Sequence, residues 1–151
     1  MSGLTPSMAI DRMRKFCGYQ ERAHCDVRAK LIKLQVYGDD LEDIISQLVD
    51  EDYLNEERYA RSYVRGKFRI NKWGKFKIRM YLQQKRVSEY CINKGMEEID
   101  DEEYINVIDD LLVRKLAGNT DFKSIQKARD SVMRKGFESG LISERLAVLR
   151  R

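Results

Sequence analysis

The chain has 151 residues, of which 42% are apolar and 36% charged, and 29 Lys and Arg against 25 Asp and Glu give a net charge of +4. This length fits one domain or a short array of small repeats, and the apolar share argues against disorder of the whole chain. The sequence has no apolar run long enough for a transmembrane helix, and Met1–Ile10 lacks the pattern of a secretory signal. Three cysteines without a CxxC spacing predict reduced thiols, so we expect a cytoplasmic protein.

Helical periodicity runs through the whole chain, and three cap signals predict where helices begin. Thr5 precedes Pro6, Asn55 precedes two acids, and Asp100 opens an acidic turn. An apolar stripe at four-residue spacing follows each cap: Ala9, Met13 and Cys17; Ala60, Val64 and Phe68; Ile108, Leu112 and Leu116. Strand-like alternation is missing, so the sequence predicts an all-α fold.

The sequence also matches itself at shifts of 51 and then 50 residues. The matched positions, all apolar, are Val27, Leu31, Val36, Leu41, Ile45 and Leu48; Ile78, Leu82, Val87, Ile92, Met96 and Ile99; Ala128, Val132, Phe137, Ile142, Leu146 and Leu149. Turns are predicted near Tyr37–Gly38, Arg86–Val87 and Gly136–Phe137. Because small repeats bury a core by stacking, we expect an elongated, curved array of three tandem three-helix repeats, with boundaries at 1–52, 53–100 and 101–151.

The charges are segregated along the chain. Residues 39–57 contain nine acidic and no basic side chains, residues 58–88 contain eleven basic and no acidic ones, and residues 89–110 contain nine acidic and one basic. The basic segment, residues 58–88, has no carboxylate of its own for i,i+4 pairs. Beyond the plain interpretation as a solvated helix face, either the acidic flanks fold back on it, or it binds a polyanion. The acidic flanks have two interpretations as well: they stabilise helix starts, or they pair with the basic segment or mimic DNA.

The middle repeat carries the most specific pattern. It contains the string Tyr53-Leu54-Asn55-Glu56-Glu57-Arg58-Tyr59-Ala60, then Trp73-Gly74, and then Leu82 with Lys85-Arg86-Val87. From about Met8 to Leu149 the chain resembles the RecX family of bacterial recombination regulators, including the threefold repetition. Arg86 stands where the family usually has glycine, so this turn must close without an easy left-handed residue.

The resemblance implies a regulator of DNA repair and the SOS response that binds the RecA recombinase and its filament on single-stranded DNA. Such a protein inhibits recombinase, ATPase and coprotease activity by binding, has no enzymatic activity or cofactor of its own, and is expected to be a monomer that does not bind membranes. The alternative is a helical-repeat protein that binds DNA independently of RecA. A purely protein-binding scaffold would leave the charge of the basic segment unexplained.

The basic segment is the candidate binding site, because cations contact phosphates while aromatic rings stack on unpaired bases. Four of its arginines, at positions 58, 61, 65 and 69, share one face of the predicted helix. Phe68 is expected in the core, whereas Trp73 is either a packing staple or an exposed stacking residue. The predicted DNA- or RecA-binding residues are Arg58, Arg61, Arg65, Lys67, Arg69, Lys72, Trp73, Lys75, Lys77, Arg79, Lys85 and Arg86.

Catalytic and metal sites are not predicted. His24 is the single histidine, and with Cys17 and Cys25 it falls short of the four ligands of a structural zinc site. The sequence has no Gly-rich phosphate loop, and Cys91 is interpreted as a small buried apolar residue.

Overall fold

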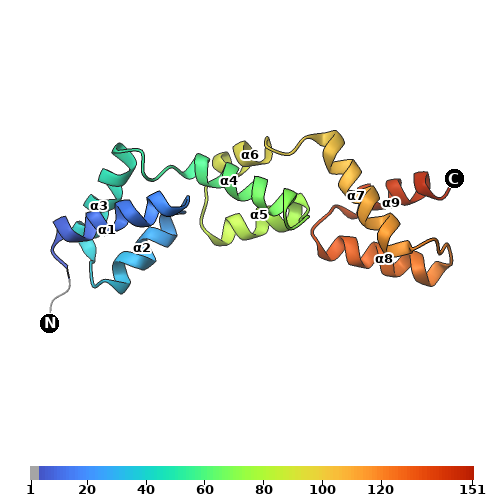
Figure 1. Cartoon of the computed structure of the whole chain (residues 1–151), viewed down its shortest axis with the longest axis horizontal. Coiled ribbons are helices and arrows are strands. Elements are labelled where there is room, and N and C mark those ends of the chain that lie inside the picture. The colour runs from blue at the N-terminus through green and yellow to red at the C-terminus, as the bar shows by residue number, and fades with distance from the viewer. Residues whose placement is uncertain (1–3) are drawn as a thin grey trace. The chain divides into compact units, whose positions relative to one another are not determined.

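The computed structural model describes residues 4–151, so the first three residues of the segment Met1–Ile10 lie outside it. Over the described residues the secondary structure is helical and contains no strand, which confirms the predicted all-α class (Figure 1). The helices are α1 (Pro6–Tyr19), α2 (His24–Lys33), α3 (Gly38–Asp50), α4 (Glu56–Arg69), α5 (Lys75–Gln84), α6 (Glu89–Met96), α7 (Asp101–Leu116), α8 (Phe122–Arg134) and α9 (Ser139–Leu149). None of these helices combines the length and the apolar character that crossing a membrane requires.

Side-chain caps begin α1, α4 and α7 at the three predicted positions. Each cap oxygen accepts a backbone N–H of the first turn and so satisfies a donor that has no partner within the helix. The bonds are Met8 N to Thr5 Oγ1 (3.2 Å), Arg58 N to Asn55 Oδ1 (2.9 Å) and Glu103 N to Asp100 Oδ2 (2.9 Å). These bonds confirm the helix starts expected from the sequence.

The described chain forms two compact units. The first unit comprises the chain up to Ser62 together with Leu82–Gly95, and the second comprises Tyr63–Tyr81 together with Met96–Arg151. Helices α4 and α5 each begin in one unit and end in the other, so the basic segment contributes residues to both. The predicted repeat boundaries at 1–52, 53–100 and 101–151 stay a prediction.

The predicted apolar stripes form the cores of the two units. All nine stripe residues of α1, α4 and α7 are buried, and of the eighteen matched positions only Met96 and Leu149 remain partly exposed. Helix α7 packs against both α8 and α9 in the second unit. Its Tyr104, which the stripes did not include, is only 2% exposed, and its ring lies between those of Phe68 (5.8 Å) and Phe137 (5.1 Å).

Residues with a left-handed backbone conformation close three equivalent turns: between α2 and α3, between α5 and α6, and between α8 and α9. Gln35, Arg86 and Gly136 have φ angles of 65°, 60° and 99°, and they are related by the same offsets of 51 and 50 residues as the apolar positions. In the first unit, Val36 N and Val87 N donate to Leu31 O and Leu82 O at 2.9 and 3.1 Å, the i to i−5 bond of a Schellman turn. Arg86 therefore adopts the left-handed conformation itself, and the first of these turns centres on Gln35 rather than on Gly38.

The cysteines pack largely as apolar side chains. Cys17 and Cys91 are buried, Cys25 is half-buried, and all three are free thiols whose pKa is raised by burial. Cys91 lies in the first turn of α6, where its backbone N–H donates to Ser88 Oγ at 3.2 Å. This position confirms the interpretation of Cys91 as a small buried apolar residue.

Candidate polyanion interface

The twelve predicted site residues divide between the two units. Arg58, Arg61, Lys85 and Arg86 belong to the first unit, and the remaining eight, Arg65, Lys67, Arg69, Lys72, Trp73, Lys75, Lys77 and Arg79, belong to the second. Each group of residues is therefore surrounded by side chains of its own unit.

Carboxylates pair with three of the four predicted site residues in the first unit. Arg58 Nε donates to Glu21 Oε2 at 2.7 Å, and Lys85 Nζ donates to Asp26 Oδ1 at 2.6 Å. These hydrogen bonds raise the pKa of both basic groups, because each bond favours the charged form. Arg61 Nε contacts Glu57 Oε2 at 3.1 Å, an i,i+4 pair formed by an acid just before the basic segment.

In the second unit, the acids that follow the basic segment reach two of its cations. Arg65 Nη1 contacts Glu98 Oε1 at 3.0 Å, and Lys75 Nζ lies 3.7 Å from Asp101 Oδ1. Lys75 Nζ also lies 4.7 Å from the centroid of the Tyr104 ring, a cation–π distance. The acidic flank thus neutralises part of the basic segment, as one of the two sequence interpretations expected.

Trp73 is half-buried and covered by its neighbours. The ammonium groups of Lys67 and Lys77 lie over the indole at 4.8 and 4.4 Å from the ring centroid, and the Tyr81 ring centroid is 5.0 Å away. The Trp73 backbone N–H also donates to Lys67 O at 3.0 Å, which fixes the loop after α4. These contacts are those expected of the packing staple, and Trp73 as a binding residue stays a prediction.

Three backbone N–H groups at the start of α5 are already hydrogen-bonded. A helix N-terminus normally offers free backbone N–H groups to anions. Here those of Gly74, Lys75 and Phe76 donate to partners in the second unit, and the acceptors are Lys135 O (2.7 Å), the Tyr104 hydroxyl (2.9 Å) and Gly136 O (3.0 Å), respectively.

This junction depends on two glycines and on Tyr104. A Cβ on Gly74 would lie 2.3 Å from the Gly136 carbonyl, so only glycine permits this approach of two backbones. The Tyr104 hydroxyl also donates to Glu138, and burial raises its pKa above the ordinary range. Both glycines were singled out from the sequence, but Tyr104 was not. The one sequence feature that points to Tyr104 is its position four residues before Ile108, in line with the apolar stripe of α7.

Two cations at the end of α4 and just after it have no such partner. Arg69 and Lys72 are exposed and make no ion pair within residues 4–151. Beside them along the chain, Ile70 is 80% exposed and Phe76 is 70% exposed. Residues 69–76, which run from the last residue of α4 to the first turn of α5 and which we call the α4–α5 loop, therefore combine free positive charge with exposed apolar surface.

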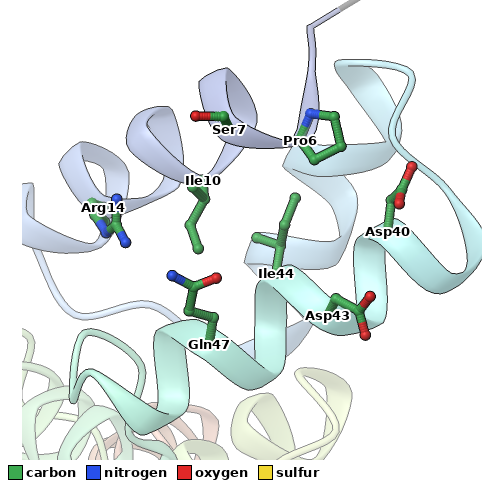
Figure 2. Close-up of a pocket in the computed structure, with 8 residues that line it drawn as sticks. All are labelled: Pro6, Ser7, Ile10, Arg14, Asp40, Asp43, Ile44 and Gln47. Atoms are coloured by element: carbon green, nitrogen blue, oxygen red, sulfur yellow. The ribbon is translucent and has the colours of Figure 1, made fainter.

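A cleft in the first unit has different chemistry. It lies between α1 and α3, encloses about 350 Å³, and has Ile10 and Ile44 among its lining residues (Figure 2). Arg14 at its edge is already engaged, because Nη2 contacts Glu51 at 2.8 Å and Nη1 contacts Asp11 at 2.7 Å, and this pairing lowers the pKa of Glu51 to about 2. Since the lining is largely polar, the cleft differs from a typical small-molecule site. Its residues are Pro6, Ser7, Ile10, Arg14, Asp40, Asp43, Ile44 and Gln47.

Comparison with known proteins connects this architecture to one family. The family model described as "RecX, second three-helix domain" matches residues 55–96. Two similar proteins are "Regulatory protein RecX" from Lactobacillus gasseri (29% identical, covering 93% of this chain and 54% of the relative) and from Oceanobacillus iheyensis (28%, 85% and 48%). A crystal structure of RecX from Lactobacillus salivarius superimposes with a TM-score of 0.85 at 24% identity, covering 96% of both chains. The chain spans about half the length of the two relatives matched by sequence.

Proposed function

We propose, because the chain belongs to the RecX family, that it regulates the RecA recombinase by binding RecA and its filament on single-stranded DNA. The relatives are named regulatory proteins, and this naming supports a role in binding rather than in catalysis. In this proposal the protein lowers the ATPase, recombinase and coprotease activities of RecA and performs no chemistry itself.

The observation that supports the proposal most directly is the basic segment. Part of its charge is neutralised by Glu21, Asp26 and Glu98, yet Arg69 and Lys72 of the α4–α5 loop stay available to an anionic partner. A filament on DNA presents phosphates, and cations that contact phosphates bind them with strong salt dependence.

The test is a measurement of RecA's DNA-dependent ATPase with and without this protein. Wild type at equimolar or lower amounts is expected to inhibit, and the variant Arg61→Ala/Arg65→Ala/Arg69→Ala is expected to inhibit less. A matched variant with three exposed lysines of the second unit replaced by alanine, Lys115, Lys123 and Lys127, is expected to behave as wild type. A wild-type protein without effect on RecA would contradict the proposal, and full inhibition by the arginine variant would exclude this face as the inhibitory one.

A further inference from the structure

We infer that the α4–α5 loop contacts single-stranded nucleic acid, with Phe76, and not Trp73, stacking on an unpaired base. This inference rests on the proposed function, because it names the polyanion that the basic segment binds. It also names the side chain that recognises a single strand by stacking on an unpaired base.

Exposure distinguishes the aromatic residues of this region. Phe68 is buried in the core, and Trp73 is covered by Lys67, Lys77 and Tyr81. Phe76 is 70% exposed, so its ring is open to an incoming base. Stacking needs an open ring face, which makes Phe76 the platform of this loop.

Phe76 is also held in place before any ligand arrives. Its backbone N–H donates to Gly136 O at 3.0 Å, and the preceding Gly74 N–H donates to Lys135 O at 2.7 Å. Both bonds lie within the second unit and fix the first turn of α5. A ring on a fixed backbone loses less conformational freedom on binding than one on a mobile loop, which favours affinity.

The phosphates would be met by side chains rather than by the helix terminus. The first backbone N–H groups of α5 already have acceptors, and Lys75 is directed at Asp101 and the Tyr104 ring. Arg69 and Lys72 supply the free positive charge of the loop. An acidic protein surface would satisfy these cations but would leave the phenyl ring of Phe76 facing carboxylates, whereas a nucleotide satisfies both.

The experiment is fluorescence anisotropy of a labelled oligothymidylate titrated with wild type and variants. Phe76→Ala is expected to weaken binding roughly 5- to 100-fold, the loss of one stacked base, while Phe76→Trp retains binding. Arg69→Ala/Lys72→Ala is expected to reduce the slope of log K against log salt by about 1.4, because each phosphate contact on a single strand contributes about 0.7. Phe122→Ala is the matched control, since Phe122 is 82% exposed, belongs to the same unit and lies at the start of α8, outside this loop. Circular dichroism checks that each variant is folded.

An abasic oligonucleotide of the same length separates stacking from charge. On this probe Phe76→Ala is expected to bind as wild type does, whereas Arg69→Ala/Lys72→Ala is still weaker. The inference is overturned if wild type fails to bind oligothymidylate, if Phe76→Ala binds it like wild type, or if the variant loses equal affinity on both probes. It is also overturned if Phe76→Ala changes inhibition of RecA but not DNA binding, which would indicate a protein contact. Stacking through Phe76 without any effect of wild type on RecA would support this inference and contradict the proposed function.

Discussion

The turn between α5 and α6 and the turn between α8 and α9 occupy equivalent positions in the repeated sequence, but only the second contains glycine. Arg86 and Gly136 both have positive φ angles, 60° and 99°. The difference lies in their neighbours: a Cβ on Gly136 would come within 2.3 Å of Lys77 Cβ and 2.7 Å of Lys77 N. Glycine at position 136 is therefore required by the close approach of a second backbone as well as by the turn, and this approach places the first residues of α5.

The two units also differ in how segments distant in sequence are joined to each other. In the first unit, side-chain ion pairs join them, such as Arg58 with Glu21 and Lys85 with Asp26. The second unit has such pairs too, including Arg65 with Glu98, but there the main chain of Gly74 and Phe76 also bonds to the main chain of the α8–α9 turn. In an exposed ion pair, either residue can be replaced by another of the same charge at little cost in stability. A junction between two backbones tolerates very little added volume.

The largest effect is expected from Gly136→Ala. The added methyl group meets Lys77 main-chain atoms at a strained φ, so we expect a loss of about 3 kcal/mol in the free energy of unfolding. Urea denaturation followed by circular dichroism measures it. Gly118→Ala is the control, because Gly118 has a φ of 84° and no atom within 4 Å of the added carbon. That variant is expected to lose only about 1 kcal/mol, and equal losses in the two variants would contradict the role of close approach.

A smaller effect is expected from Tyr104→Phe, which keeps the ring but removes the hydroxyl. The hydroxyl accepts from Lys75 N–H and donates to Glu138, so the substitution leaves a backbone donor unpaired. We expect a loss of about 1–3 kcal/mol and faster amide hydrogen exchange at Lys75. Tyr37→Phe, at an exposed tyrosine of the first unit, should leave stability unchanged. Unchanged exchange at Lys75 would show that this bond does not hold the junction.

The smallest effect is expected at the first-unit turn. Arg86→Gly relieves the left-handed strain of a residue with a side chain but increases the freedom of the unfolded chain, so we expect a net gain of about 0.5 kcal/mol. Thermal unfolding of Arg86→Gly and Arg86→Ala, which lose the same charge, isolates the backbone contribution. A lower melting temperature for the glycine variant would contradict this account of the turn.

Features that repeat locally could be read from the sequence. The caps at Thr5, Asn55 and Asp100 and the apolar stripes follow from rules that act within one helix, and the structure confirms them. The turn at Arg86 was located correctly as well, because its offset from Gly136 is the same as that of the apolar positions.

Features that depend on the meeting of distant segments could not be read in this way. The pairing of Arg65 with Glu98 and of Lys85 with Asp26 joins residues 33 and 59 positions apart, and charge counts alone do not choose between these partners and a polyanion. Tyr104 was missed because its importance lies in a hydroxyl that meets the start of α5, not in helical periodicity. The sequence left Trp73 open between packing and stacking, and the structure places the ammonium groups of Lys67 and Lys77 over its ring.

The position of Trp73 has a spectroscopic consequence. It is the single tryptophan of the chain, and it lies in the second unit under the ammonium groups of Lys67 and Lys77. Its emission therefore reports the loop that precedes α5 without interference from the first unit, where tyrosine is the strongest remaining fluorophore. The protein carries a natural probe that distinguishes the unfolding of one unit from that of the other.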